Sequence, residues 1–193
     1  HVARMFQLMG NSEADAEAHA DTVMSMETAL AKGSMTLVDQ RDPRKLYHPA
    51  SERRLQSLTP VFDWKSYLAG MGVAGNDRFN VSQPRFFQTL DFQLRMRSLD
   101  EIKTYLRWHV AHVSAPFLSQ PFVDENFDFY RRTLRGVTQV APLWQRCVVL
   151  IDNQIGEALG EEFVKDNVSP ELKANPLHMT RQIQAAMESE IKN

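Results

Sequence analysis

The sequence has 193 residues, of which 43% are hydrophobic and 24% charged; this fits one soluble domain with a full core and excludes a disordered chain. Its 22 basic and 24 acidic residues are nearly balanced, which argues against nucleic-acid binding, and the longest apolar run, residues 147–151, is too short for a membrane helix. A single cysteine, Cys147, excludes an internal disulfide framework and a cysteine-based zinc site.

The first long helix is predicted from Asn11 or Ser12, either of which can cap it, to Gly33, with acidic residues in its first turn. Glu27 falls within its apolar stripe. A buried carboxylate needs a partner or a shifted pKa, so we expect Glu27 to pair with an arginine of another helix; a catalytic acid is the less favoured interpretation. The polar residues 39–49 predict a connecting loop.

The middle of the chain contains a glycine-rich segment and one short strand. Asp63 is expected to cap a short helix that leads into residues 70–75. This segment superficially resembles a dinucleotide fingerprint, but it follows a helix and therefore predicts a flexible turn. Residues 79–81 predict a strand, residues 80–82 match a glycosylation sequon that is too short to indicate function, and Pro84 opens the next helix.

Ser98 starts the clearest helix, because Ser98 and Glu101 match a capping box. Asp124 is expected to cap a further helix that stops at Gly136, after prolines that break the chain. The predicted buried face of the Ser98 helix consists of Leu99, Ile102, Leu106, His109 and Val113.

A long helix follows Pro142, with apolar residues four positions apart as far as Phe163. The final helix starts at Pro170 or Pro176, and Pro176 is the favoured start. Its apolar face continues to Asn193 without a stop signal, so we expect a fragment of a longer protein. The fold class predicted for residues 1–193 is all-α: a single, irregular multi-helix domain with at most one short strand pair.

His109 and His112 are the only close histidine pair. A zincin needs His-Glu-x-x-His, which places two imidazoles on one helical face with a glutamate as base, and the sequence lacks this motif. We therefore favour a core imidazole at His109, bonded to a backbone carbonyl, over a metal ligand. Two further groups are interpreted structurally: the aromatic residues Phe127, Phe129, Tyr130 and Trp144 as core, and the arginines Arg131, Arg132 and Arg135 as a solvated or paired face, with an anion site as the alternative.

Four stretches in the second half of the chain form an ordered set: residues 103–108, 124–130, 134–136 and 144–147, the last followed by residues 156–164. Their order and spacing resemble the non-catalytic N-terminal region of the neprilysin and endothelin-converting-enzyme family of zinc metalloendopeptidases, whose bacterial members are oligopeptidases. Gln145 departs from the family pattern, which has a basic residue there. Secreted relatives pair the cysteine equivalent to Cys147 with an earlier one, which would precede His1 here.

The resemblance implies a periplasmic or extracellular zinc endopeptidase whose zinc ligands and catalytic base lie beyond Asn193. This segment would form much of the smaller, helical lid domain, whose partner is the C-terminal catalytic domain of the same chain. The two domains would enclose a cavity that admits only short peptides. The resemblance places no catalytic, cofactor-binding or metal residue within 1–193, so we expect this chain alone to be inactive. The alternatives are a free-standing helical interaction module without enzymatic activity, and a small-ligand binder that uses the His109 and His112 helix.

Overall fold

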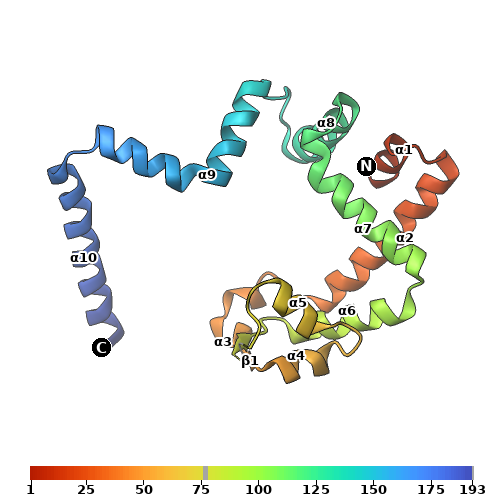
Figure 1. Ribbon diagram of the computed structural model, residues 1–193, viewed down its shortest axis with the longest axis horizontal. Coiled ribbons are helices and arrows are strands. Elements are labelled where there is room, and N and C mark those ends of the chain that lie inside the picture. The colour runs from red at the N-terminus through yellow and green to blue at the C-terminus, as the bar shows by residue number, and fades with distance from the viewer. Residues whose placement is uncertain (76–77, 193) are drawn as a thin grey trace. The chain divides into compact units, whose positions relative to one another are not determined.

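The computed structural model describes residues 1–75 and 78–192, which fall into two compact units divided after Thr138 (Figure 1). The described residues are mostly helical. One antiparallel strand pair joins β1 (Pro49–Ala50) to β2 (Phe79–Asn80), with Pro49 opposite Asn80. The all-α fold class, with at most one short strand pair, is confirmed; the single domain over 1–193 stays a prediction.

The first unit consists of helices of very different lengths. Local capping sets several of their starts as expected: the Ser12 side chain accepts a hydrogen bond from the amide of Asp15, and the Asp63 side chain accepts one from the amide of Ser66. Pro84 occupies the first turn of its helix. The α-helices are α1 (Val2–Leu8), α2 (Glu13–Gly33), α3 (Pro43–Leu46), α4 (Glu52–Leu58), α5 (Trp64–Gly70), α6 (Pro84–Met96), α7 (Leu99–Ser114) and α8 (Gln120–Phe127). Two short 3₁₀ helices, η1 (Asp39–Arg41) and η2 (Ala115–Phe117), lie between them, and a π-helix, η3 (Asp128–Thr133), continues α8.

Two segments of this unit differ from the prediction. Residues 39–49, expected as a loop, contain η1 and α3, because Asp42 caps a short helix that has Pro43 in its first turn. Helix α8 starts at Gln120 and not at Asp124, since Pro121 lies in its first turn, where a proline needs no hydrogen-bonded amide. In both segments a proline opens a helix where a break was expected.

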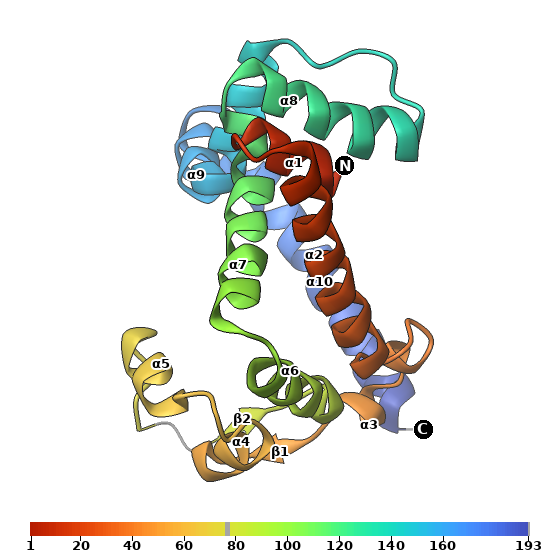
Figure 2. The ribbon, with the colours of Figure 1, turned by 90° about the vertical axis from the view of Figure 1, so that its right-hand side faces the viewer.

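The core of the first unit lies where α1, α2 and α7 meet, and in Figure 2 α7 runs beside α2. On α7 the buried residues are Thr104, Trp108 and Ala111. Leu99, Leu106 and Val113, predicted to be buried, are exposed, so the predicted core face of this helix was wrong. The core residues of this cluster are Met5, Phe6, Ala16, Val23, Trp108 and Ala115, and a second cluster consists of Leu55, Leu58, Trp64 and Val81.

The second unit contains α9 (Leu143–Asn167), which bends at Ile155, and α10 (Pro170–Lys192). Helix α10 starts at Pro170, not at the favoured Pro176, because the Ser169 side chain accepts a hydrogen bond from the Leu172 amide and caps the earlier turn. Pro176 therefore lies inside the helix. Across the described residues, every helix is too short or too polar to cross a membrane.

Candidate functional site

The Glu27 carboxylate on α2 faces α7, where it meets a tyrosine and a histidine. Its Oε1 accepts a hydrogen bond from the Tyr105 hydroxyl at 2.9 Å and lies 3.3 Å from Nε2 of His109. Tyr105 and His109 are one helical turn apart, so both side chains point toward α2. The predicted arginine partner was wrong: the partners are a phenol and an imidazole.

This contact also changes the interpretation of His109. The side chain is partly exposed and paired with a carboxylate, so it is not the predicted core imidazole bonded to a backbone carbonyl. Partial burial, together with the hydrogen bond to Glu27, raises the pKa of the Tyr105 phenol well above its usual range, which keeps the hydroxyl protonated as a donor. Glu27, Tyr105 and His109 thus connect α2 to α7, and this set of interactions is called the Glu27 contact below.

His112 belongs to a separate aromatic cluster one turn further along α7. Its ring stacks on Trp108, with centroids 5.2 Å apart, and lies 5.2 Å from the ring of Tyr130. His1, whose side chain is only 3% exposed, packs edge-on against Trp108 and pairs with Glu125 through Nδ1 at 2.9 Å. Burial, followed by repulsion from His109, lowers the pKa of His112, although the charge of Glu27 opposes this shift.

Nδ1 of His112 is buried and has no hydrogen-bond partner in the described part of the chain. The neutral imidazole therefore fits this cluster better than the charged form. Within residues 1–75 and 78–192, no group of three or more His, Cys, Asp or Glu side chains is placed to hold a metal ion.

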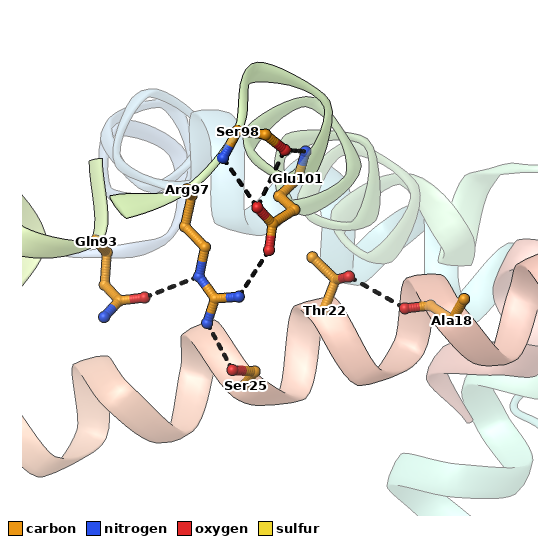
Figure 3. A network of polar contacts seen from close by, with 7 residues as sticks. All are labelled: Ala18, Thr22, Ser25, Gln93, Arg97, Ser98 and Glu101. Atoms are coloured by element: carbon orange, nitrogen blue, oxygen red, sulfur yellow. Dashed lines mark hydrogen bonds and ion pairs between the residues drawn. The ribbon is translucent and has the colours of Figure 1, made fainter. Parts of the chain in front are cut away.

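Arg97, which the sequence analysis did not single out, joins three helices at the bend between α6 and α7 (Figure 3). Its guanidinium donates to the Glu101 carboxylate at 2.7 Å, to the Ser25 hydroxyl of α2 at 2.5 Å, and to the Gln93 side chain of α6 at 3.2 Å. The other carboxylate oxygen of Glu101 accepts from the Ser98 amide at 2.9 Å, which completes the predicted capping box. An arginine directly before a capping box is the sequence signal that could have indicated this junction.

The remaining candidate residues have mainly structural surroundings. Arg132 pairs with Asp128 and lies 5.3 Å from the centroid of the Phe127 ring, as expected of a paired face. Phe127 is buried, whereas Trp144, predicted to be core, is largely exposed. Cys147 is a free, exposed thiol.

The earlier segment 70–80 also has a structural interpretation. Gly72 and Gly75 adopt positive φ, as the predicted turn requires. The side-chain carbonyl of Asn80, the sequon asparagine, accepts a hydrogen bond from the His48 amide, and its NH₂ donates to the Ser82 hydroxyl.

An open groove of about 570 Å³ lies beside α7 and is called the α7 groove below. Its apolar lining side chains come from α7, the end of α1 and the η2–α8 corner, and two cationic residues, Lys103 and Arg107, also line it. A surface of this kind can bind an apolar partner. The apolar lining residues are Met9, Leu106, Val110, Ala111, Leu118 and Phe122.

The features described above are contacts between helices and an apolar groove. Comparison with known proteins identifies the family. The model of the N-terminal region of peptidase family M13 matches residues 1–193. Neprilysin-3 of Drosophila melanogaster is 28% identical over 100% of this chain, and the endothelin-converting enzyme homolog of Locusta migratoria is 25% identical. The chain spans 26% and 28% of these two relatives.

Solved structures agree with this match. The Mycobacterium tuberculosis zinc metalloprotease Zmp1 in its open state superposes on 96% of this chain with a TM-score of 0.86 and 31% identity, over 29% of its own length. The same protease in complex with an inhibitor gives a TM-score of 0.83 over 92% of this chain. The predicted neprilysin-like resemblance is confirmed, and the chain belongs to peptidase family M13, to whose N-terminal region it corresponds.

Proposed function

We propose that this chain is the non-catalytic, helical part of a zinc-dependent metalloendopeptidase and helps to enclose its substrate cavity. The observation that carries the proposal is the family match over residues 1–193. It is supported by the described side chains at α7 and at the α6–α7 junction, which form contacts from helix to helix. The zinc ligands and the catalytic base would then lie in the C-terminal catalytic domain of the same polypeptide.

In this proposal the size of a substrate decides whether it can reach the catalytic site. A helical wall over the catalytic domain admits short, flexible peptides and excludes folded proteins, because a folded chain cannot enter an enclosed space without unfolding. Zinc in the catalytic domain would activate water for peptide hydrolysis, and this segment would contribute shape and water exclusion. Family membership also favours a periplasmic or extracellular location.

The test uses one cleavable sequence in two contexts. The full-length protein is incubated with the free peptide and with the same peptide inserted into an exposed loop of a stable, folded carrier. We expect a chelator-sensitive cut of the free peptide and an intact carrier, while an ordinary open-cleft protease cuts both. Cleavage of the carrier loop at the rate of the free peptide would show that residues 1–193 do not restrict access.

A free-standing interaction module is the second candidate, and the exposed apolar face of α7 is the observation that favours it. The two functions differ in the full-length protein: a module binds a separate protein and cleaves no peptide at any length. The free-peptide measurement above therefore separates them.

A further inference from the structure

Helix α7 is apolar on more than one side. Thr104, Trp108 and Ala111 face the core of the first unit, whereas Leu106 is 56% exposed and Val110 is 69% exposed. A helix that covers a domain surface normally has one apolar stripe, which faces the core, and a polar opposite side. The outer side of α7 therefore has the composition of a contact surface.

The α7 groove gives this surface a defined shape. Lys103 and Ser114 mark its ends along α7, and their separation of eleven positions corresponds to about 16 Å, or three helical turns. Its walls are side chains of α7, of the end of α1 and of the η2–α8 corner, and no strand edge lines it, so an added strand would find no backbone partners there. An amphipathic helix, which needs only apolar side chains to pack against, fits such a groove.

Two cationic side chains of α7 line the groove, so they favour a partner with negative charge. Lys103 reaches only Asp100, at 3.9 Å, and Arg107 makes no ion pair with any residue that the structure describes. Both lie on α7 one turn apart, so a carboxylate on a bound helix could contact either one. The complementary partner has an apolar stripe flanked by Asp or Glu.

We propose that the α7 groove binds an acidic, amphipathic helix from the part of the same polypeptide that lies outside residues 1–193. The relatives are long enough to contain such a helix elsewhere in their sequences, because this chain spans only 26% and 28% of their length. A segment of the same polypeptide is also present at a high effective concentration, which a separate protein lacks. The inference depends on a longer polypeptide and not on peptidase activity, so it can fail while the proposed function holds.

The first experiment is hydroxyl-radical footprinting of the full-length protein, with each residue normalised to the unfolded protein. Leu106 is compared with Leu37, which is 79% exposed, and Val110 with Val38, which is 75% exposed, so the residue types match. We expect oxidation of Leu106 and Val110 to be reduced about fivefold or more, because packed interface residues exclude water. Oxidation of Leu106 and Val110 near their unfolded values would overturn the proposal.

The same measurement distinguishes the other occupants. Protection that disappears on roughly hundredfold dilution would show that a second copy of the protein occupies the α7 groove, because dimers dissociate on dilution. Protection that requires an added short peptide would show that the groove is a substrate site. Either result overturns the proposal.

The second experiment identifies the acidic partner. A zero-length carbodiimide reagent joins a lysine amine to a carboxylate in direct contact, and we expect a cross-linked peptide between Lys103 and an Asp or Glu outside residues 1–193. Lys103→Arg keeps the charge but removes the amine, so it should abolish this cross-link and leave the footprint of Val110 unchanged. A cross-link from Lys103 to Asp100 alone would contradict the proposal.

Discussion

Gly33, the last residue of α2, provides a sharp test of how closely α2 and α6 pack. A Cβ atom added at Gly33 would lie 2.7 Å from Cβ of Thr89 on α6, well inside ordinary van der Waals contact. Because the Cβ of Thr89 is fixed to the α6 backbone, no change of rotamer relieves this contact. Gly33→Ala must therefore push the two helices apart.

The expected cost follows from this geometry. Overpacking of a well-packed contact lowers the free energy of unfolding by about 1–3 kcal/mol. Replacement of a helical glycine by alanine raises it by up to about 1 kcal/mol. The net loss in the free energy of unfolding is about 1–2 kcal/mol, which corresponds to a decrease in Tm of about 3–6 °C for a chain of this size. The assay is thermal and urea unfolding followed by circular dichroism.

Gly70 is the matched control, since it also ends a helix of the first unit and an added Cβ would meet nothing within 4 Å. Gly70→Ala should leave Tm unchanged or raise it slightly. Equal stability of Gly33→Ala and Gly70→Ala would show that α2 and α6 do not approach each other as closely as described.

Four further predictions concern the aromatic cluster around His112, the Glu27 contact, the capping box at Ser98 and the thiol of Cys147. The pKa of His112 is lowered in the folded state, so the unfolded state binds more protons and stability should decrease as pH falls through about 6.5; His112→Phe, which keeps the stacking, should flatten this decrease in urea titrations, and an unchanged slope would contradict the burial of His112. Glu27→Gln removes the carboxylate charge that helps to raise the pKa of Tyr105 and of Tyr130, so ultraviolet titration should show tyrosine ionising at lower pH than before; an identical curve would exclude the Glu27 contact. Ser98→Ala should cost about 1 kcal/mol of unfolding free energy because it removes the capping box, whereas Ser98→Thr should retain most of it. Cys147 is exposed, so a thiol reagent should label it in the native chain, and labelling only after unfolding would show that it is covered.

Local chemistry made much of the fold predictable. The caps at Ser12, Asp63 and Ser98 lie where expected, because a side chain that satisfies an amide three residues later depends on near neighbours only. The family was predictable for a related reason, since an ordered set of short stretches is visible in the sequence before any contact is known. Pro176 shows the limit of such local signals, because a proline favours a helix start only where no better cap precedes it.

The tertiary partners were not predictable. Helical periodicity identified Leu106 and Val113 as apolar, but it could not show that α2 packs against another side of α7. The pairing of Glu27 with Tyr105 and His109, and the contact of Arg97 with Ser25, join residues more than seventy positions apart. Such contacts depend on how the helices cross, which a single sequence does not reveal.

In the proposed function, residues 1–193 contribute structure and not chemistry to a zinc peptidase. The most direct test compares the full-length protein with the isolated 193-residue chain for bound zinc and for cleavage of a fluorogenic peptide, each with and without a chelator. We expect bound zinc and chelator-sensitive cleavage in the full-length protein only. Zinc-dependent cleavage by the isolated chain, or a full-length protein that binds no zinc and cuts no peptide, would contradict the proposed function.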